Sequence, residues 1–372
     1  MAALSFPGVP AGAMPAPPPA WIIRAVLGVR GVLLKLANAI TPPEVIVLER
    51  ATGVALTMAI ASFVKHYVPL LDDGPIAADE AARRLGRDPD TTFRFLHFVA
   101  SGGFVTMRPD RRFEHNRVSR ILSRGHHSRA AHFVEYFASG SNVKSWLDLD
   151  ATLVTGKNAF DRVHGTSVWN WFDAHPEERE CFAEAMMGFT LGDAPFVAAG
   201  YPFKEVTKIC DVGGGRGTLV SELLLRHPHL RATLVDNAGV LDLARDLLAH
   251  RGVGDRVTLT PGNFFERVPG GSDLYLLKNV LHDWDDARSI AILETVRAAM
   301  QPGQKVLIIE SFIDRSGPDP MVSGADMQMM MVCGEGRERT EQDFRALLAA
   351  AGFTPGRAFP QPVASMIEGV LP

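Results

Sequence analysis

The feature that most constrains the fold of this chain is an alternation of short apolar runs with helical patterns. It begins at about residue 204 and continues almost to the C-terminus. The apolar runs have the length of strands, and the segments between them space their apolar residues as one face of a helix does. Such an alternation predicts an α/β domain built on a doubly wound parallel sheet. The expected strands are Val206–Val212, Ala232–Val235, Val257–Thr260, Leu274–Leu277 and Val306–Ile309, and the expected helices are 217–227, 238–250, 287–300 and 341–351.

The part of the chain before this alternation, residues 21–200, has mostly helical patterns. Within it, two short helical patterns are joined by a turn at Gly86–Pro89, and a hairpin pattern follows with its turn at Pro109–Asp110. Helix, turn, helix and hairpin together make a winged-helix pattern. The composition changes near Gly200–Pro202, where we place the boundary between two domains.

The first twenty residues are rich in proline and alanine and contain no Lys or Arg, so they lack the basic region of a signal peptide. We expect residues 1–20 to form a disordered tail. The following apolar segment is interrupted by Arg24, Arg30 and Lys35. A membrane span seldom carries three charges, so we expect an amphipathic helix that packs on protein.

Composition excludes several classes of function. The chain has 372 residues and a net charge of −4, which gives no overall basic field for nucleic acid. Its three cysteines form no C-x-x-C pair, which suits a reducing cytosol and argues against disulfides or a thiolate zinc site. We therefore expect a cytoplasmic protein that binds neither nucleic acid nor membrane.

A glycine-rich turn follows the first expected strand. Gly213, Gly215 and Gly217 form a G-x-G-x-G run, which lacks both the spacing of the dinucleotide fingerprint and the Gly-Lys-Ser/Thr of a phosphate-binding loop. Three glycines let the backbone approach a ligand that lies over the N-terminus of the next helix, where a carboxylate is favoured. Alone, this turn is a weak signal.

Two further features strengthen it. Asp236 stands at the carboxyl end of the second strand, where an acid can accept hydrogen bonds from ribose hydroxyls, although it could also cap the next helix. Asn263 and Phe264 follow the third strand, and they could meet the edge and the face of an adenine. A nucleoside ligand without a phosphate-binding loop indicates S-adenosylmethionine.

The segment LLKNVLHDWDD, residues 276–286, places His282 just after an apolar run. The histidine could be a catalytic base, a metal ligand or only a polar residue at the end of a strand. The aspartates beside it match no calcium-loop spacing, and no second ligand cluster is evident, so we expect no metal. Asp285 or Asp286 instead suits the N-cap of the following helix, and Trp284 suits packing.

In order along the chain, DVGGGRG, HDWDD, IIES and GRERT resemble the plant-type small-molecule O-methyltransferase family and its bacterial members in antibiotic biosynthesis. The resemblance runs from about residue 45 to the C-terminus. It implies a Rossmann-like class I methyltransferase domain at residues 201–372. Residues 21–200 would then form a winged-helix domain that mediates homodimerisation and covers the substrate.

The resemblance also implies roles for individual residues. His282 would deprotonate the acceptor hydroxyl, and Glu310 and Glu338 would orient its imidazole. An imidazole with a pKa of about 6.5 can take a phenol's proton without being trapped as imidazolium. Lys278 matches a position that contacts the adenosyl group, although it could equally be a solvated lysine at a strand end. Candidates for the acceptor cavity are Met186, Phe182 and Met329, since thioethers pack well on aromatic rings.

The expected reaction is the methylation of a hydroxyl on an aromatic secondary metabolite, with S-adenosylmethionine as cofactor. The same fold could instead methylate nitrogen or carbon, or support hydroxylation or decarboxylation. A winged-helix DNA-binding regulator is a third hypothesis, but Phe93, Phe95 and Phe98 make the second helix too apolar for a solvent-facing recognition helix. Asn263 departs from the aspartate that many relatives carry. The identity of the acceptor lies beyond the sequence.

Overall fold

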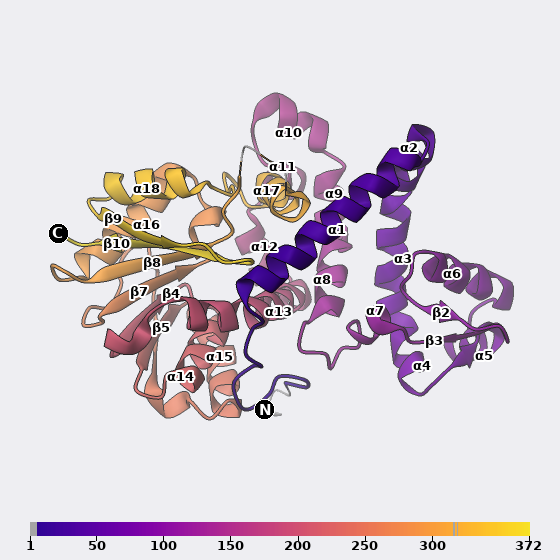
Figure 1. The fold of residues 1–372 in the computed structure, drawn as a ribbon, viewed down its shortest axis with the longest axis horizontal. Coiled ribbons are helices and arrows are strands. Elements are labelled where there is room, and N and C mark those ends of the chain that lie inside the picture. Colours follow the sequence, from indigo (N-terminus) through magenta and orange to yellow (C-terminus); the bar gives the residue numbers. More distant parts are fainter. Residues whose placement is uncertain (1–5, 315–316, 318) are drawn as a thin grey trace.

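The computed structural model describes residues 6–314, 317 and 319–372. The chain forms a sheet-based part and a mainly helical part, and the long helix α13 extends from one to the other (Figure 1). The sheet-based part contains β4 (Lys208–Val212), β5 (Arg231–Asp236), β6 (Val257–Pro261), β7 (Leu274–Lys278), β8 (Lys305–Glu310), β9 (Thr354–Phe359) and β10 (Ser365–Val370). Its helices are α14 (Thr218–Arg226), α15 (Ala238–His250), α16 (Asp286–Ala298), α17 (Pro320–Val332) and α18 (Glu341–Ala350), with the 3-10 turns η1 (Phe203–Glu205), η2 (Gly254–Arg256) and η3 (Leu281–Asp283).

Among the described residues the large sheet has seven strands in the order β6-β5-β4-β7-β8-β10-β9. The first five are parallel, as predicted, and each overlaps one of the expected strands. Their residues alternate between two cores. Leu274 and Leu276 face the core beneath α14 and α15, whereas Tyr275 and Leu277 face the core beneath α16 and α18. β7 and β8 are buried on both faces and are nearly continuous apolar runs, whereas β6 at the edge of the sheet is only partly buried and alternates with threonine.

One edge of the sheet is antiparallel, which the alternation of strands and helices did not predict. β10 pairs antiparallel with β8 and with β9, so the sheet is mixed. Neither strand has a continuous apolar run: β9 contains Pro355 and Gly356, and the β9–β10 pairing is irregular between Ile367 and Gly369. The expected helices match α14, α15, α16 and α18, whereas α17 was not predicted.

The winged-helix pattern is present in the helical part. A three-stranded sheet in the order β1-β3-β2 lies beside α5 and α6 (Figure 1). Phe93 and Phe95 of α6 pack on the core of this unit. Its strands are β1 (Ile76–Ala77), β2 (Thr106–Met107) and β3 (Arg112–Glu114), and its helices are α3 (Gly53–His66), α4 (Val68–Asp72), α5 (Ala78–Leu85) and α6 (Pro89–Ser101).

The remaining helices lead to the sheet. They are α7 (Arg117–Arg120), α8 (Ala130–Phe137), α9 (Gly140–Trp146), α10 (Leu149–Thr155), α11 (Ala159–His164), α12 (Val168–Ala174) and α13 (Pro176–Gly200). α13 packs against both α8 and α14, and it ends next to the boundary that we place at Gly200–Pro202. The division into residues 1–20, 21–200 and 201–372 remains a prediction.

The N-terminal segment, residues 6–19, differs from the expected disordered tail. Phe6, Val9 and Met14 are buried in a small apolar cluster with Met187 and Leu191 of α13 and Leu247 of α15. Backbone carbonyl groups of the segment accept hydrogen bonds from buried arginines. The composition rich in proline and alanine concealed these anchors, so the expectation is wrong for residues 6–19. Residues 1–5 lie outside the described residues.

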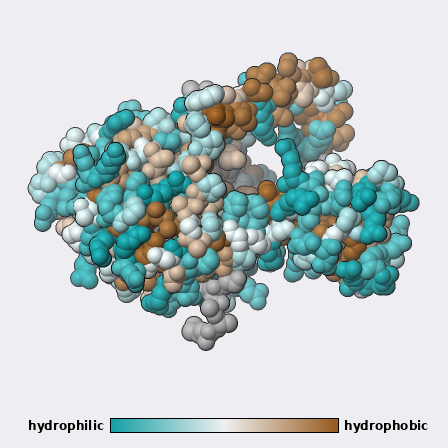
Figure 2. All heavy atoms as spheres, turned by 60° about the horizontal axis from the view of Figure 1, so that its bottom comes forward, coloured by the Kyte–Doolittle hydropathy of each residue, from teal (hydrophilic) through white to brown (hydrophobic). Residues whose placement is uncertain are grey.

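Helix α1 (Ala20–Ile40) and the following α2 (Pro43–Ala51) project along one side of the molecule (Figure 1). α1 was expected to pack on protein, but none of its residues is buried within this chain. Figure 2 shows hydrophobic side chains gathered on this projection. Those of α1 that are more than half exposed are Trp21, Val26, Leu27, Val29, Val32, Leu33, Leu36 and Ile40.

No single helix within the described ranges has both the length and the apolar character needed to cross a membrane. α2 and α3 meet those criteria only when they are taken together, and they are bent by 41° at the break between them.

Candidate active site

The carboxyl ends of β4, β7 and β8 meet where the chain's strand order reverses, between β4 and β7. Ligands of α/β sheets bind in the crevice beyond strand ends at such a point. The glycine turn follows β4, the 3-10 turn η3 with His282 follows β7, and Glu310 is the last residue of β8. The sheet topology therefore brings together groups that lie up to a hundred residues apart in the chain.

The turn η3 is fixed by bonds to the segment before α18. The carbonyl oxygen of His282 accepts the backbone N–H of Arg337 at 2.8 Å. The buried guanidinium of Arg339 donates to the carbonyl oxygens of Leu281 and Trp284, both at 2.7 Å. These bonds hold His282 beside the segment that carries Glu338.

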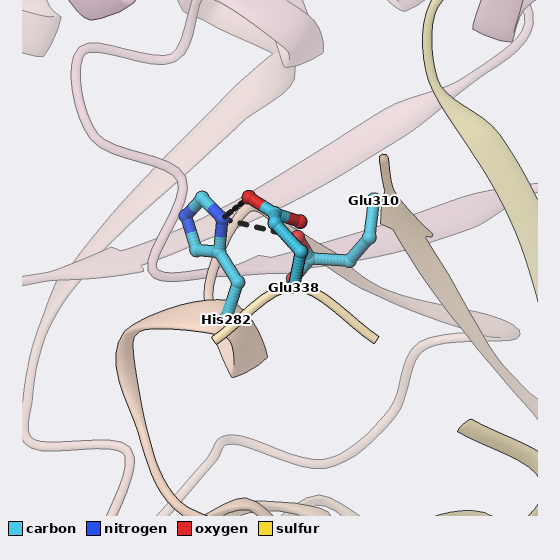
Figure 3. Close-up of side chains that lie close together, drawn as sticks. All are labelled: His282, Glu310 and Glu338. Atoms are coloured by element: carbon cyan, nitrogen blue, oxygen red, sulfur yellow. Dashed lines mark hydrogen bonds and ion pairs between the residues drawn. The ribbon is translucent and has the colours of Figure 1, made fainter. Parts of the chain in front are cut away.

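Two buried glutamates flank one nitrogen of the His282 ring (Figure 3). Nδ1 of His282 lies 3.0 Å from Oε1 of Glu338 and 3.6 Å from Oε2 of Glu310. Oε1 of Glu310 accepts the backbone N–H groups of Val280 and Leu281, at 3.1 and 3.0 Å. The other ring nitrogen, Nε2, points away from both glutamates (Figure 3). With a hydrogen on Nδ1 donated to Glu338, the lone pair of Nε2 is left for a reacting group.

The electrostatics of this cluster differ from those of an isolated imidazole. Burial alone would lower the pKa of His282, but the surrounding carboxylates, Glu310 foremost, outweigh burial and raise that pKa to about 10. Burial raises the pKa of Glu310 to about 7, against the opposing effect of His282. His282 therefore has a basicity near that of a phenolate rather than of free imidazole, whose pKa is about 6.5.

Asp283 was not predicted as a site residue. Its Oδ1 lies 3.6 Å from Nε2 of His282, on the side opposite to the glutamates. Burial raises the pKa of this carboxyl to about 6, and the buried thiol of Cys333 donates a hydrogen bond to it. The other two aspartates have structural roles: Asp285 caps α16 by accepting the backbone N–H of Arg288 at 2.7 Å, and Asp286 pairs with arginines.

His282, Glu310 and Glu338 also satisfy the spacing of a metal site. One donor atom from each of His282, Glu310 and Glu338 lies within 4.8 Å of the others. Geometry alone therefore does not distinguish an imidazole oriented by two acids from a metal-binding cluster. That the site works without a metal remains a prediction.

The glycine turn has the backbone expected of a ligand cradle. Gly213, Gly215 and Gly217 all have positive φ, at 71°, 58° and 75°. A side chain at Gly214 would collide with Leu234 and with the carboxylate of Asp211. The turn is thus closed to larger residues on its inner side.

Asp236 lies directly against this turn. Its Oδ2 accepts the N–H of Gly215 at 2.9 Å, and its Oδ1 accepts the N–H of Asn237 at 2.7 Å. The N-cap of α15 is Asn237, so the alternative reading of Asp236 as a helix cap is wrong. Burial raises the pKa of Asp236, as expected for a carboxylate inside a crevice.

A second acid, Asp211, lies beneath the turn and was missed by the sequence reasoning. It is 1% exposed, and neither carboxylate oxygen has a hydrogen-bond partner among the described residues. Burial raises its pKa to about 7, although the nearby ammonium of Lys278 opposes the rise. The signal in the sequence is its place two residues before Gly213, as the acid of D-x-G-x-G.

Lys278 is not the solvated lysine of the alternative interpretation. Its side chain is 6% exposed, and Nζ lies 3.3 Å from Oδ2 of Asp193 and 3.4 Å from Oγ1 of Thr190, both on α13. The structure therefore places Lys278 between the strand end and α13.

The two residues expected at an adenine lie differently. The ring of Phe264 lies beside Gly213: a Cβ added at this glycine would be 3.5 Å from the nearest atom of the ring. The amide of Asn263 is used within its own turn, where Nδ2 donates to Glu266 at 3.0 Å and Oδ1 accepts the N–H of Phe265 at 3.0 Å. Phe264 is brought to the glycine turn, whereas the side chain of Asn263 is not.

An aromatic compartment adjoins the histidine. The ring of Phe182 on α13 lies 5.0 Å from that of Phe172 and 5.2 Å from that of Tyr136. Met329 packs on the same cluster, which continues to Cys333 beside Asp283. Met186 lies one helical turn after Phe182 and is half-buried, but it is not part of this cluster. Trp169 and Trp171 also pack against this cluster.

Comparisons with known proteins agree with this arrangement. Residues 146–354 match the family described as an O-methyltransferase domain. The mitomycin biosynthesis 6-O-methyltransferase of Streptomyces lavendulae is 37% identical over 304 residues, which cover 81% of this chain and 86% of that protein. The solved structure of the mitomycin 7-O-methyltransferase MmcR is 34% identical, with a TM-score of 0.83, and covers 91% of this chain and 100% of its own.

A further solved relative carries ligands. It is an O-methyltransferase (NcsB1) from neocarzinostatin biosynthesis, in complex with S-adenosyl-L-homocysteine and 1,4-dihydroxy-2-naphthoic acid. It is 27% identical with a TM-score of 0.72, and the match covers 85% of this chain and 96% of that one. The sheet order, the ordered motifs and these matches confirm the predicted family and fold. The chain belongs to the S-adenosylmethionine-dependent small-molecule O-methyltransferases.

Proposed function

We propose that this enzyme methylates a hydroxyl of an aromatic secondary metabolite, of phenolic, polyketide or quinoid type, and that His282 is the base. The observation that carries the proposal is the orientation of the imidazole: two buried glutamates hold Nδ1, while Nε2 is directed away from them. A carboxylate on Nδ1 fixes the tautomer in which Nε2 accepts a proton.

His282 accepts the hydroxyl proton of the acceptor at Nε2 while Glu338 and Glu310 stabilise the imidazolium that forms. A phenol has a pKa of about 10. The raised pKa of His282, also about 10, makes this transfer nearly balanced in free energy. S-adenosylmethionine supplies an electrophilic methyl on a sulfonium centre and leaves as a neutral thioether, so no general acid is required.

The residues of the glycine turn fit this cofactor. Asp236 stands where ribose hydroxyls can donate to its free lone pairs, and Phe264 presents a ring for the adenine. The unpartnered carboxylate of Asp211 suits the cationic amino group of the methionine moiety. In this proposal Gly213 and Gly215 line the cofactor, and Lys278 fixes the same edge through Asp193.

The aromatic compartment supports the choice of acceptor. Phe182 and Met329 offer flat and soft surfaces for a fused ring system, with Met186 one turn further along α13. Of the matched relatives named above, one is a 6-O-methyltransferase of mitomycin biosynthesis and another is bound to 1,4-dihydroxy-2-naphthoic acid. We place the enzyme in the cytoplasm, because its cysteines are free thiols.

We further propose that the enzyme is a homodimer in which a second copy covers α1 and α2. A monomer rarely exposes so long a row of apolar side chains. A two-fold axis would pair the projection of each copy with the same or an adjoining surface of its partner. Phe93 and Phe95 pack inward, so the winged-helix unit does not serve nucleic acid in this proposal.

The test is His282→Ala, assayed by mass spectrometry against a panel of polyphenols and hydroxyquinones with labelled S-adenosylmethionine. Turnover should fall by about 10²- to 10⁴-fold, as for loss of a general base, while calorimetric binding of S-adenosylhomocysteine persists. His229→Ala, at an exposed histidine of the same domain, is the matched control. Unchanged turnover would refute His282 as the base, and a product methylated on nitrogen or carbon, or hydroxylated, would refute the reaction. Activity after exhaustive chelation supports the absence of a metal.

A further inference from the structure

Arg216 is the only residue of the run 213–217 that is not glycine, so it is the only residue of the glycine turn that has a side chain. This side chain is 4% exposed and leaves the turn toward α13. Its NH1 lies 2.5 Å from Oε1 of Glu184, and its NH2 lies 2.5 Å from Oε2 of Glu180. The cofactor turn is thus tied to α13 by two ion pairs.

The carboxylate of Glu184 has a second arginine on its other oxygen. Nε of Arg129 lies 2.9 Å from Oε2 of Glu184, and the Arg129 side chain is 2% exposed. NH1 of Arg129 donates to the carbonyl oxygens of Arg124 and Pro7, at 3.1 and 3.0 Å. Glu184 therefore bridges a residue of the cofactor turn and a residue that precedes α8.

The hydrogen bond from Arg129 to Pro7 also links the N-terminal segment to Glu184 and the glycine turn. The segment is seated between α13 and α15 by the buried side chains of Phe6, Val9 and Met14. A side chain at Gly8, whose φ is 76°, would collide with the backbone of Gly125, so the segment lies directly on the loop before Arg129. The position of Arg129 is accordingly fixed by two separate stretches of backbone.

Because Arg216 and Arg129 are buried, their ion pairs are favourable only when both partners keep their positions. Charged groups taken out of water are tolerated when they are paired, and removal of one partner leaves an uncompensated charge. Arg216 and Arg129 are both buried, and Glu184 is 14% exposed. The free energy of the ion pairs therefore depends on the turn, α13 and the Arg129 loop keeping their relative positions.

We propose that Arg216 and Arg129 are positioning residues that act through Glu184 to hold the glycine turn in its cofactor-binding conformation. Residues 6–14 take part by holding Arg129. The inference rests on the proposed cofactor site but concerns groups to which that proposal gives no role in binding or in chemistry. It makes the affinity for S-adenosylmethionine a property of the contact between the helical part and the sheet, not of the turn alone.

The experiment compares the binding of S-adenosylhomocysteine by calorimetry in the wild type and in Arg216→Met, which removes both ion pairs but keeps an unbranched side chain. The dissociation constant should rise by about tenfold or more, as for loss of charged hydrogen bonds. The turnover number at saturating S-adenosylmethionine should stay within about threefold, because the chemical step is untouched. This division between affinity and turnover separates positioning from a general loss of structure.

Glu184→Gln tests the same connection from α13 and serves if Arg216→Met does not fold. It should also weaken binding, and the double variant should bind no more weakly than Arg216→Met alone, because linked residues are not additive. Arg345→Met removes an ion pair with Glu341 on the surface of the same domain and should bind as the wild type does.

Wild-type affinity in folded Arg216→Met, or additive effects of the two changes, would overturn the inference and leave the proposed function intact. If the wild type itself bound no S-adenosylhomocysteine, the proposed cofactor site would fail, and this inference with it.

Discussion

Glu310→Gln should lower the pKa of His282 without disturbing the strand end that carries it. The glutamine oxygen can still accept the backbone N–H groups of Val280 and Leu281, now bonded at 3.1 and 3.0 Å. What is lost is a negative charge 3.6 Å from Nδ1 of His282. The perturbation is therefore electrostatic and local.

The size of the effect follows from that distance. At 3.6 Å and an effective dielectric constant of about 20, two unit charges attract by ~4.6 kcal/mol. One pH unit corresponds to ~1.4 kcal/mol, so full removal of the charge would lower the pKa of His282 by ~3 units. Glu310 is itself only partly ionised near neutral pH, because its pKa is raised to about 7, and the two groups titrate together. We therefore expect the pKa to fall from about 10 by ~1.5 to 3 units.

The pKa of His282 also determines how catalysis depends on pH. His282 acts as a base only when it is neutral, and a pKa raised to about 10 leaves about one imidazole in a hundred neutral at about pH 8. Wild-type kcat/KM should therefore rise with pH up to about pH 10. In Glu310→Gln the rise should end at lower pH and at a lower plateau, because a weaker base accepts the phenol proton less readily.

Carbon-13 NMR of labelled histidine, with His282→Ala for assignment, measures this pKa without any acceptor, and kcat/KM over the same pH range provides the kinetic counterpart. Glu341→Gln, at a half-exposed glutamate paired with Arg345, is the control and should change neither titration. A His282 pKa that stayed near 10 or rose in Glu310→Gln would refute the electrostatic account. The raised basicity of the imidazole would then have to come from Asp283 and Glu338.

Two further outcomes are expected. Asp236→Ala should weaken calorimetric binding of S-adenosylhomocysteine by about 1 to 3 kcal/mol, the range for loss of a buried polar partner, and undiminished affinity would exclude Asp236 as the ribose acceptor. Leu33→Glu, in the exposed row of α1, should convert a dimer into monomers in sedimentation velocity, because burying an unpaired carboxylate costs more than the leucine contact contributes. Leu153→Glu, at an exposed leucine of α10, is the comparison, and a Leu33→Glu protein that remained dimeric would place the interface elsewhere.

The central parallel strands were predictable because they are buried on both faces. β7 and β8 appear in the sequence as nearly unbroken apolar runs, and their residues alternate between two cores. The antiparallel edge was not predictable by the same rule. β9 is the edge strand of the sheet and pairs only with β10. It begins Thr-Pro-Gly, so its sequence pattern resembles a loop, and it is the pairing with β10 that makes it a strand.

The site shows the same division. His282, Glu310 and Glu338 could be named because each belongs to a motif, yet only the sheet topology shows that both acids address the same nitrogen. Asp283 was not predicted as a site residue, since nothing in HDW indicates that its carboxyl faces Nε2. Asp211 was concealed within an apolar strand, where its burial becomes apparent only once helices cover both sides.

The N-terminal segment was misread for a related reason. Its apolar anchors are Phe6, Val9 and Met14, spaced too irregularly for any helix or strand. These side chains pack against α13 and α15, and buried arginines donate hydrogen bonds to the backbone of the segment. The segment is therefore fixed by its partners and not by its own sequence pattern. A pattern rule that considers one segment at a time cannot detect an anchor whose partners lie elsewhere in the chain.

In the proposed site, α13 is the element that connects the cofactor to the acceptor. Glu184 on this helix binds the cofactor turn through Arg216, Asp193 binds Lys278 at the next strand end, and Phe182 faces the aromatic compartment. Phe182 and Glu184 lie within one turn of this helix, so an acceptor that displaces the helix at Phe182 also displaces a group that holds the glycine turn. Such coupling is reciprocal by linkage: an acceptor that tightens cofactor binding must itself be bound more tightly when the cofactor is present. Because Arg216 is the connection between helix and turn, Arg216→Met should reduce the coupling as well as the affinity.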